Sequence, residues 1–155
     1  MSSPSLEPIV AALPMFAGMK DEHILLIAEC GRNVRFEAGE YIGRQGDPSD
    51  RFWVIREGRV ALQIHAAERG EVIVRTVGVN EVLGWSWLVP PHQWHFDARA
   101  LTTTRAIEFD ARCLAGKFRN DYEFGFELFR RFSQVIAERL EATGLQLIDL
   151  PGHAS

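Results

Sequence analysis

Residues Phe36 to Val60 read FEAGEYIGRQGDPSDRFWVIREGRV, and this stretch is the most informative part of the chain. Short apolar runs, such as Tyr41-Ile42 and the run from Phe52 to Ile55, alternate in it with turns that carry glycine, aspartate, serine or proline. Apolar runs of this length bounded by turn residues are typical of β-strands joined by hairpins. The stretch therefore predicts a meander of short strands.

The segments on either side of this meander predict helices. Residues 9–16 and 21–30 read as two short helices, with Asp21 as the N-cap of the second and Gly31 as its stop. Strands are expected from Asn33 to Phe109. Many short strands followed by helices indicate an α+β chain built on a β-barrel or jelly roll.

The C-terminal part predicts a short helix and then a long one. Asp110 is expected to cap a helix that runs to Phe118, and residues 122–147 form one long helical pattern that Pro151-Gly152 ends. Apolar residues recur there in steps of three and four, which places them on one helix face. That predicted face consists of Phe129, Phe132, Ile136, Leu140, Thr143 and Leu147.

The composition is that of an ordinary globular domain. Of the 155 residues, 46% are hydrophobic and 25% are charged. The net charge of −4 lacks the positive excess that is typical of nucleic-acid-binding domains. The sequence shows neither a signal peptide nor a membrane-spanning run, so we expect a cytoplasmic protein. Cys30 and Cys113 lie far apart and lack metal-binding spacing, so two reduced, buried thiols are expected.

Several short motifs together resemble the cyclic-nucleotide-binding domain family, which includes bacterial catabolite-activator regulators. The segment Leu13-Pro14-Met15-Phe16 is similar to the motif in the family's first helical segment. Turn residues of the family match Gly39, Gly46, Asp47, Asp50 and Gly58. The resemblance implies one domain over residues 1–155, with N-terminal helices in 1–32, a barrel of the cyclic-nucleotide-binding type in 33–109, and C-terminal helices in 110–150.

The resemblance also implies a ligand segment, the phosphate-binding cassette, over residues 84–100. In the family a Gly-Glu pair opens the cassette, its glutamate binds the ribose, and an arginine near its end binds the cyclic phosphate. Here Gly84 matches, but Trp85 stands at the glutamate position. Trp94 or His95 stands at the arginine position, depending on the register, and the strand register favours Trp94. Arg99 is the only arginine nearby, and it lies well along the following strand.

Loss of both anchors disfavours a cyclic nucleotide as ligand, because its phosphate charge needs a charged partner once it is desolvated. The candidate ligand-binding residues are Gly84, Trp85, Ser86, Trp87, Leu88, Trp94 and His95. Three tryptophans among them suggest an aromatic site for a different small molecule. Equally, the same tryptophans could fill the old pocket and leave a structural barrel. Either way, Trp85, Trp87 and Trp94 are predicted to lie close together around Gly84.

Two other functions are open at this point. Jelly rolls include metal-dependent, cupin-like enzymes, but His92 and His95 are two residues apart and His65 is isolated, so no metal site and no enzyme is expected. The chain could instead be the effector domain of a transcriptional regulator without its DNA-binding part. Because the sequence ends soon after Pro151-Gly152 and is acidic, DNA binding by the chain itself is not expected.

The long C-terminal helix predicts a homodimer. Its apolar face is larger than a water-exposed helix normally carries, and such faces usually mark an interface. Charged residues that could set the register flank this face, namely Arg130, Arg131, Glu138, Arg139 and Glu141. In the family it resembles, the equivalent helix pairs with that of a second subunit. The alternative is that the face folds back onto its own barrel. We therefore expect a stand-alone regulatory domain with an aromatic or occluded pocket.

Overall fold

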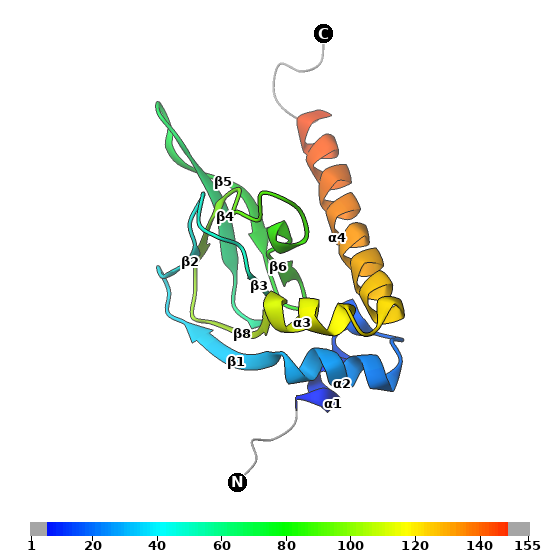
Figure 1. The fold of residues 1–155 in the computed structure, drawn as a ribbon. Helices are drawn as coiled ribbons and strands as arrows, with labels where there is room; N and C mark the ends of the chain where they lie inside the picture. The colour runs from blue at the N-terminus through cyan, green and yellow to red at the C-terminus, as the bar shows by residue number, and fades with distance from the viewer. Residues whose placement is uncertain (1–5, 149–155) are drawn as a thin grey trace.

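A computed structural model describes residues 6–148, and Figure 1 shows a β-barrel with short helices at its N-terminal end and a long helix along one side. The N-terminal segment contains α1 (Glu7–Ala12), the 3-10 helix η1 (Pro14–Phe16) and α2 (Asp21–Glu29). The strands are β1 (Gly31–Phe36), β2 (Tyr41–Gly43), β3 (Arg51–Glu57), β4 (Val60–Ala66), β5 (Gly70–Val77), β6 (Val82–Leu83), β7 (Asp97–Ala100) and β8 (Thr104–Asp110). A second 3-10 helix, η2 (Ser86–Leu88), separates β6 from β7, and α3 (Ala111–Phe118) and α4 (Tyr122–Ile148) complete the chain.

The strands form two antiparallel four-stranded sheets, in the orders β1-β8-β3-β6 and β2-β7-β4-β5. Strands distant in sequence pair in both sheets: Gly31 lies opposite Phe109, and Val60 lies opposite Ala100. The described architecture confirms the predicted jelly-roll type of fold with N-terminal helices and a long C-terminal helix.

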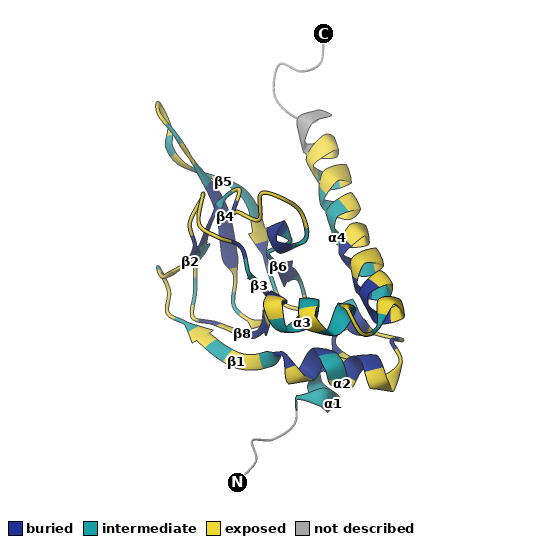
Figure 2. Ribbon diagram, viewed as in Figure 1, coloured by how far each residue is buried: buried dark blue, intermediate teal, exposed yellow. Residues whose placement is uncertain are grey.

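Strand β3 supplies side chains to two separate hydrophobic cores. Phe52 and Val54 point toward the helices, whereas Trp53 and Ile55 point into the space between the sheets. Successive side chains of a strand face opposite sides, so one run of buried residues can serve both cores. Figure 2 shows the buried residues concentrated in the barrel and in the part of α4 nearest the barrel. The cassette lies where these two cores meet.

The turn at Gly58 illustrates why the predicted glycine positions matter. Gly58 has a φ of +92°, and a Cβ atom there would lie 2.5 Å from the main-chain oxygen of Thr103. Only glycine adopts this conformation in this space without strain. The glycine quoted in the sequence motif is therefore required by the turn between β3 and β4. These strands lie in different sheets and do not pair, so the prediction of a meander over residues 36–60 is wrong at this turn.

Three sequence-based predictions near the helices are wrong. Cys30 and Cys113 are not free thiols; they form a disulfide that joins the end of α2 to α3, with Cα atoms 5.7 Å apart. This pairing could not be predicted from the spacing of the cysteines, because it depends on strand β8 returning beside β1. Lys20, not Asp21, is the N-cap of α2, and Gly31 is the first residue of β1 rather than a simple helix stop. The strands thus begin two residues earlier than expected.

The prediction for α3 is confirmed. The carboxylate of Asp110 accepts hydrogen bonds from the main-chain N–H groups of Arg112 and Cys113. An N-cap of this kind satisfies amide groups that have no partner inside the helix. The proposed stop at Pro151-Gly152 and the side chain of Leu147 lie outside the described part of the chain.

Helix α4 has the predicted extent but buries a different face. Phe124, Leu128 and Phe132 are completely buried and pack on the barrel. Phe132 therefore belongs to the chain's own core, and its assignment to an exposed face was wrong. The choice was wrong because positions 132 and 133 both fit a three- or four-residue step from Phe129.

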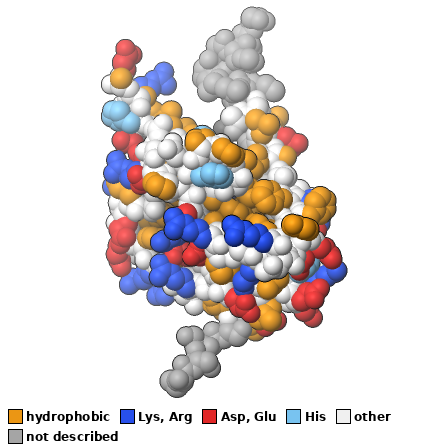
Figure 3. Space-filling view, viewed as in Figure 1, with side chains coloured by type: hydrophobic (Ala, Val, Ile, Leu, Met, Phe, Trp, Pro, Cys, Tyr) orange, Lys and Arg blue, Asp and Glu red, His pale blue; other side chains and the backbone are white. Residues whose placement is uncertain are grey.

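The outward side of α4 still carries large apolar side chains. Tyr122, Phe126, Phe129 and Leu140 are 83%, 70%, 42% and 71% exposed. Figure 3 shows hydrophobic side chains gathered on the side of the molecule where α4 lies. We call Phe126, Phe129, Ser133, Ile136 and Leu140 the outer stripe. These residues repeat every three and four positions, which is the spacing of a coiled-coil seam.

An ion-pair cluster lies on the first half of α4. Glu127 accepts hydrogen bonds from Arg130 and Arg131, and these bonds, that of Arg130 first, lower the pKa of the Glu127 carboxyl. Arg131 also donates to the main-chain oxygen of Met15, which joins α4 to the N-terminal segment.

Between residues 6 and 148 no helix is long and apolar enough to cross a membrane.

Candidate ligand-binding site

The cassette begins where β6 ends. Gly84 has a φ of +90°, and a Cβ atom there would lie 3.3 Å from the main-chain oxygen of Arg51, so the chain turns closely over β3. The 3-10 helix η2 follows and comprises only three residues. A loop that contains the cis Pro90-Pro91 bond then leads back to the barrel at Trp94. The cassette is therefore a short turn with a loop, held against both cores.

Trp94 enters the interior of the barrel. Its side chain is only 9% exposed, and its ring lies 5.8 Å from that of Trp53. The indole also covers Gly43 so closely that a Cβ atom at Gly43 would lie 2.4 Å from an indole carbon. Main-chain hydrogen bonds fix the residue in place: its N–H donates to Asp47 and its oxygen accepts from Gly46. Trp94 thus occupies space inside the barrel as a rigid part of the fold.

A small polar group lies beside Trp94. The hydroxyl of Ser86 and Nδ1 of His95 are 3.1 Å apart, and the ring of His95 lies 5.2 Å from that of Trp85. Ser86 is buried, Trp85 is half-buried, and His95 is exposed. Gly84, Trp85, Ser86, Trp94 and His95 therefore come together, which is five of the seven predicted site residues.

The cavity that these residues line is very small. Its volume is about 20 Å³, and Leu62, Phe96 and Arg139 complete its wall. A water molecule needs roughly 10–15 Å³ measured in this way, whereas pockets for small organic ligands are typically about 300–1,000 Å³. The cavity has room for about one water molecule and none for a nucleotide.

Trp87 lies elsewhere, and the prediction that all three tryptophans cluster is wrong. Its indole stacks on Phe52 at 5.4 Å and meets Phe132 edge-on at 5.2 Å, so it belongs to the core beneath α4. Leu88 packs against that same core. Trp85 is the N-cap of η2 and reaches only the edge of this core, with its ring beside His95.

Arg99 does not replace the missing arginine. Its Nε atom donates to the main-chain oxygen of Gly39, on the outer face of the sheet. Its neighbours on β7, Ala98 and Ala100, are the buried residues. The alternation of side chains along a strand thus turns Arg99 away from the cavity.

Sequence reasoning missed Arg139 as a wall residue. This arginine comes from α4, far along the chain, and donates to the main-chain oxygen of Val82 in β6, just before the cassette. Burial, and after it the positive charge of Arg75, lower the pKa of Arg139 to about 10. Nothing in the local sequence pattern signals this contact, because it depends on how α4 packs on β6.

Metal ligands are not gathered in the part of the chain that the structure describes. Residues 6–148 contain no group of three or more His, Cys, Asp or Glu side chains that could hold a metal ion. Nδ1 of His92 lies 3.0 Å from the main-chain oxygen of Trp87, so His92 braces the cassette loop. A cupin-like centre on His92 and His95 therefore has no observation in its favour.

Comparison with known proteins identifies the family. Residues 33–121 match the cyclic nucleotide-binding domain family. A cAMP-activated global transcriptional regulator of the CRP-like type from Mycobacterium tuberculosis is 26% identical over 145 residues, which cover 94% of this chain and 63% of that protein. The chain thus spans a little less than two thirds of this curated relative.

Solved structures share the fold. A cyclic nucleotide-binding domain from Methylobacillus flagellatus aligns with a TM-score of 0.79 and 15% identity, over 93% of this chain and 85% of that one. The regulatory subunit of a cAMP-independent protein kinase A from Trypanosoma brucei aligns with a TM-score of 0.67 and 22% identity, over 83% of this chain and 46% of that one. Because the family match covers more than half of the chain, and the fold agrees with it, this protein belongs to the cyclic nucleotide-binding domain family.

Proposed function

We propose that this protein is a regulatory domain whose nucleotide cavity is filled by its own Trp94. The observation that carries the proposal is the position of this indole, which lies directly against Gly43 and lines a remaining cavity of only about 20 Å³. Of the two sequence-based alternatives, this geometry favours a filled cavity over a site for a different aromatic ligand. Gly84, Trp85, Ser86 and His95 then stabilise the closed cassette.

The energetics argue against a cyclic nucleotide as the ligand. A nucleotide could enter only if Trp94 left its place, and removing a buried tryptophan typically costs about 3–5 kcal/mol. Loss of the charged hydrogen bonds to the phosphate costs roughly a further 1.5–3 kcal/mol. Together these terms weaken a micromolar affinity, about −8 kcal/mol, to the millimolar range or beyond.

Similar proteins support a role in regulation. The curated relative is a transcriptional regulator, and one structural neighbour is a kinase regulatory subunit described as cAMP-independent. A domain of this fold can therefore belong to a regulatory protein that does not depend on cAMP. No catalytic role is proposed.

The outer stripe of α4 is the proposed contact surface, and its partner is a second copy of this chain. Phe126 and Leu140 are 70% and 71% exposed, with Phe129 and Ile136 between them. Two such helices packed side by side would remove these side chains from water. The proposed dimer no longer includes Phe132, which is buried in each subunit.

Sedimentation at micromolar concentration tests the dimer. The wild-type chain should sediment as a dimer, and Phe126→Glu or Leu140→Glu should yield a folded monomer. Leu145→Glu is the matched control, because Leu145 is 63% exposed on α4 but lies off the outer stripe. A wild-type monomer, or equal effects of all three substitutions, would exclude the interface.

A second candidate is the effector domain of a transcriptional regulator, which the match to the Mycobacterium protein favours. On its own the chain has a net charge of −4, so the described domain should not bind DNA. Fluorescence polarisation with duplex DNA tests this candidate. Salt-sensitive binding by this chain would show that it carries a nucleic-acid surface of its own.

A further inference from the structure

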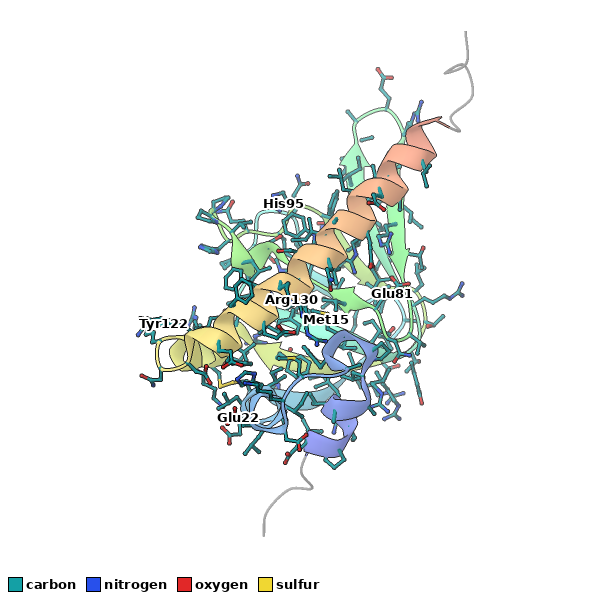
Figure 4. The ribbon with its side chains drawn as sticks, turned by 90° about the vertical axis from the view of Figure 1, so that its right-hand side faces the viewer. Met15, Glu22, Glu81, His95, Tyr122 and Arg130 are labelled. Carbon is teal, nitrogen blue, oxygen red and sulfur yellow. A yellow bond between two sulfur atoms is a disulfide. The ribbon has the colours of Figure 1, made fainter. Side chains whose placement is uncertain are left out.

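A larger hollow lies on the other side of α4 from the cassette. Its volume is about 480 Å³, within the range of pockets for small molecules, which is roughly 300–1,000 Å³. Figure 4 shows Met15 and Glu81 on one side of α4 and His95 on the other, so the hollow and the cassette cavity open on opposite sides of the helix. Arg139 contributes to the wall of both. We call the hollow the α4 crevice. Its walls come from α4, from the segment before α2, and from the end of β5 with the turn into β6.

Three arginines line the α4 crevice, and two of them have donors that the fold leaves free. Nη2 of Arg75 lies 3.3 Å from the carboxylate of Glu81, but Nε of Arg75 is buried and has no hydrogen-bond partner among the described residues. Arg139 donates to the main-chain oxygen of Val82, which is a neutral acceptor. Arg131 is already engaged by Glu127 and Met15. A buried, unpaired Nε–H is costly unless something accepts from it.

Electrostatics in the α4 crevice favour an anion. Burial and then the charge of Arg75 lower the pKa of Arg139 to about 10, which means that its charged form is poorly stabilised by its surroundings. Glu81 and Glu138 raise that pKa and offset only part of the effect. An anion between the two guanidinium groups would relieve their repulsion and accept hydrogen bonds from their Nη–H groups.

We propose that the α4 crevice binds a small phosphate-bearing molecule between Arg75 and Arg139. Guanidinium groups bind phosphate oxygens through paired hydrogen bonds, and two of them from different elements can hold one phosphate group. The amides of Asn80 and Gln134 line the same crevice and offer further donors. A phosphate held there joins α4 to β5, so its binding would fix the position of the long helix on the barrel.

Calorimetric titration with inorganic pyrophosphate tests the proposal, with sodium chloride of equal ionic strength as the reference. The wild-type chain should bind in a saturable way. Arg75→Gln and Arg139→Gln should each weaken the affinity about tenfold to a hundredfold, the effect of losing one charged hydrogen bond. Arg56→Gln is the control, since Arg56 is exposed near the end of β3 and is not among the residues that line the crevice.

NMR of the arginine Nε–Hε groups provides a readout that does not depend on the variants, in case Arg139→Gln fails to fold. Pyrophosphate should shift the Nε–Hε signal of Arg75 in the wild-type protein. The proposal is overturned if binding is absent, if Arg56→Gln weakens it as much as the crevice variants do, or if those variants bind as wild type. It is also overturned if the shifts are confined to Trp94 and His95, because the anion would then occupy the cassette.

Discussion

The contact between Trp94 and Gly43 can be measured as a coupling energy. Gly43→Ala places a Cβ atom 2.4 Å from the indole, so the ring or the strand must move. Overpacking of this kind typically costs about 1–3 kcal/mol. Trp94→Ala removes a buried side chain and should cost roughly 3–5 kcal/mol. In the double variant the new methyl group meets empty space, so the cost of Gly43→Ala should disappear.

Reversible guanidinium unfolding of the four proteins gives this coupling directly. We expect the double variant to be more stable than the sum of the single effects by about 1–3 kcal/mol. Gly116→Ala combined with Trp94→Ala is the control pair, because nothing lies within 4 Å of a Cβ atom at Gly116. Those two effects should add to within about 0.5 kcal/mol. Additive effects for Gly43 and Trp94 as well would refute the placement of the indole.

Other predictions concern α4 and the disulfide. Phe132→Ala should lower the free energy of unfolding by about 3–5 kcal/mol, because Phe132 is fully buried, whereas Phe126→Ala should leave the stability of the isolated subunit nearly unchanged. Denaturation at a concentration where the chain is monomeric separates the two, and equal losses would contradict the assignment of faces. Cys113→Ser removes a disulfide between residues 83 positions apart in sequence, so it should lower the free energy of unfolding by about 2–4 kcal/mol. If a reductant leaves the denaturation midpoint of the wild type unchanged, the disulfide is absent. The pKa of Glu127 is lowered from its ordinary value of 4.5, so its ionised form stabilises the fold above that pH. This contribution is lost as the pH falls through the folded-state pKa. The stability difference between wild type and Glu127→Gln should therefore shrink on acidification, and a constant difference would argue against the ion pair.

Local sequence patterns predicted the strands and helices because each depends on neighbours close in the chain. Gly58 shows this, since its turn conformation is dictated within a few residues. The extent of α4 followed from its periodicity in the same way. The pattern could not decide between positions 132 and 133 for the outer side, because that choice depends on how the helix packs.

The candidate site was predicted less well than the fold, for reasons of three-dimensional packing. The sequence shows Trp85 in place of the family's ribose-binding glutamate and indicates Trp94 in place of its phosphate-binding arginine. Trp94 does enter the barrel. Trp87 was placed wrongly, since a short 3-10 helix turns it into the other core. Arg139 and the Cys30–Cys113 pair were missed because both contacts join residues far apart in sequence.

Titration of the purified chain with cAMP and cGMP in a calorimeter tests the central claim most directly, namely that Trp94 fills the nucleotide cavity. We expect no saturable heat at micromolar nucleotide, and a dissociation constant of about 1 mM or larger, because the cavity of about 20 Å³ has no room for the ligand. A dissociation constant in the low-micromolar range, about −8 kcal/mol, would contradict the claim.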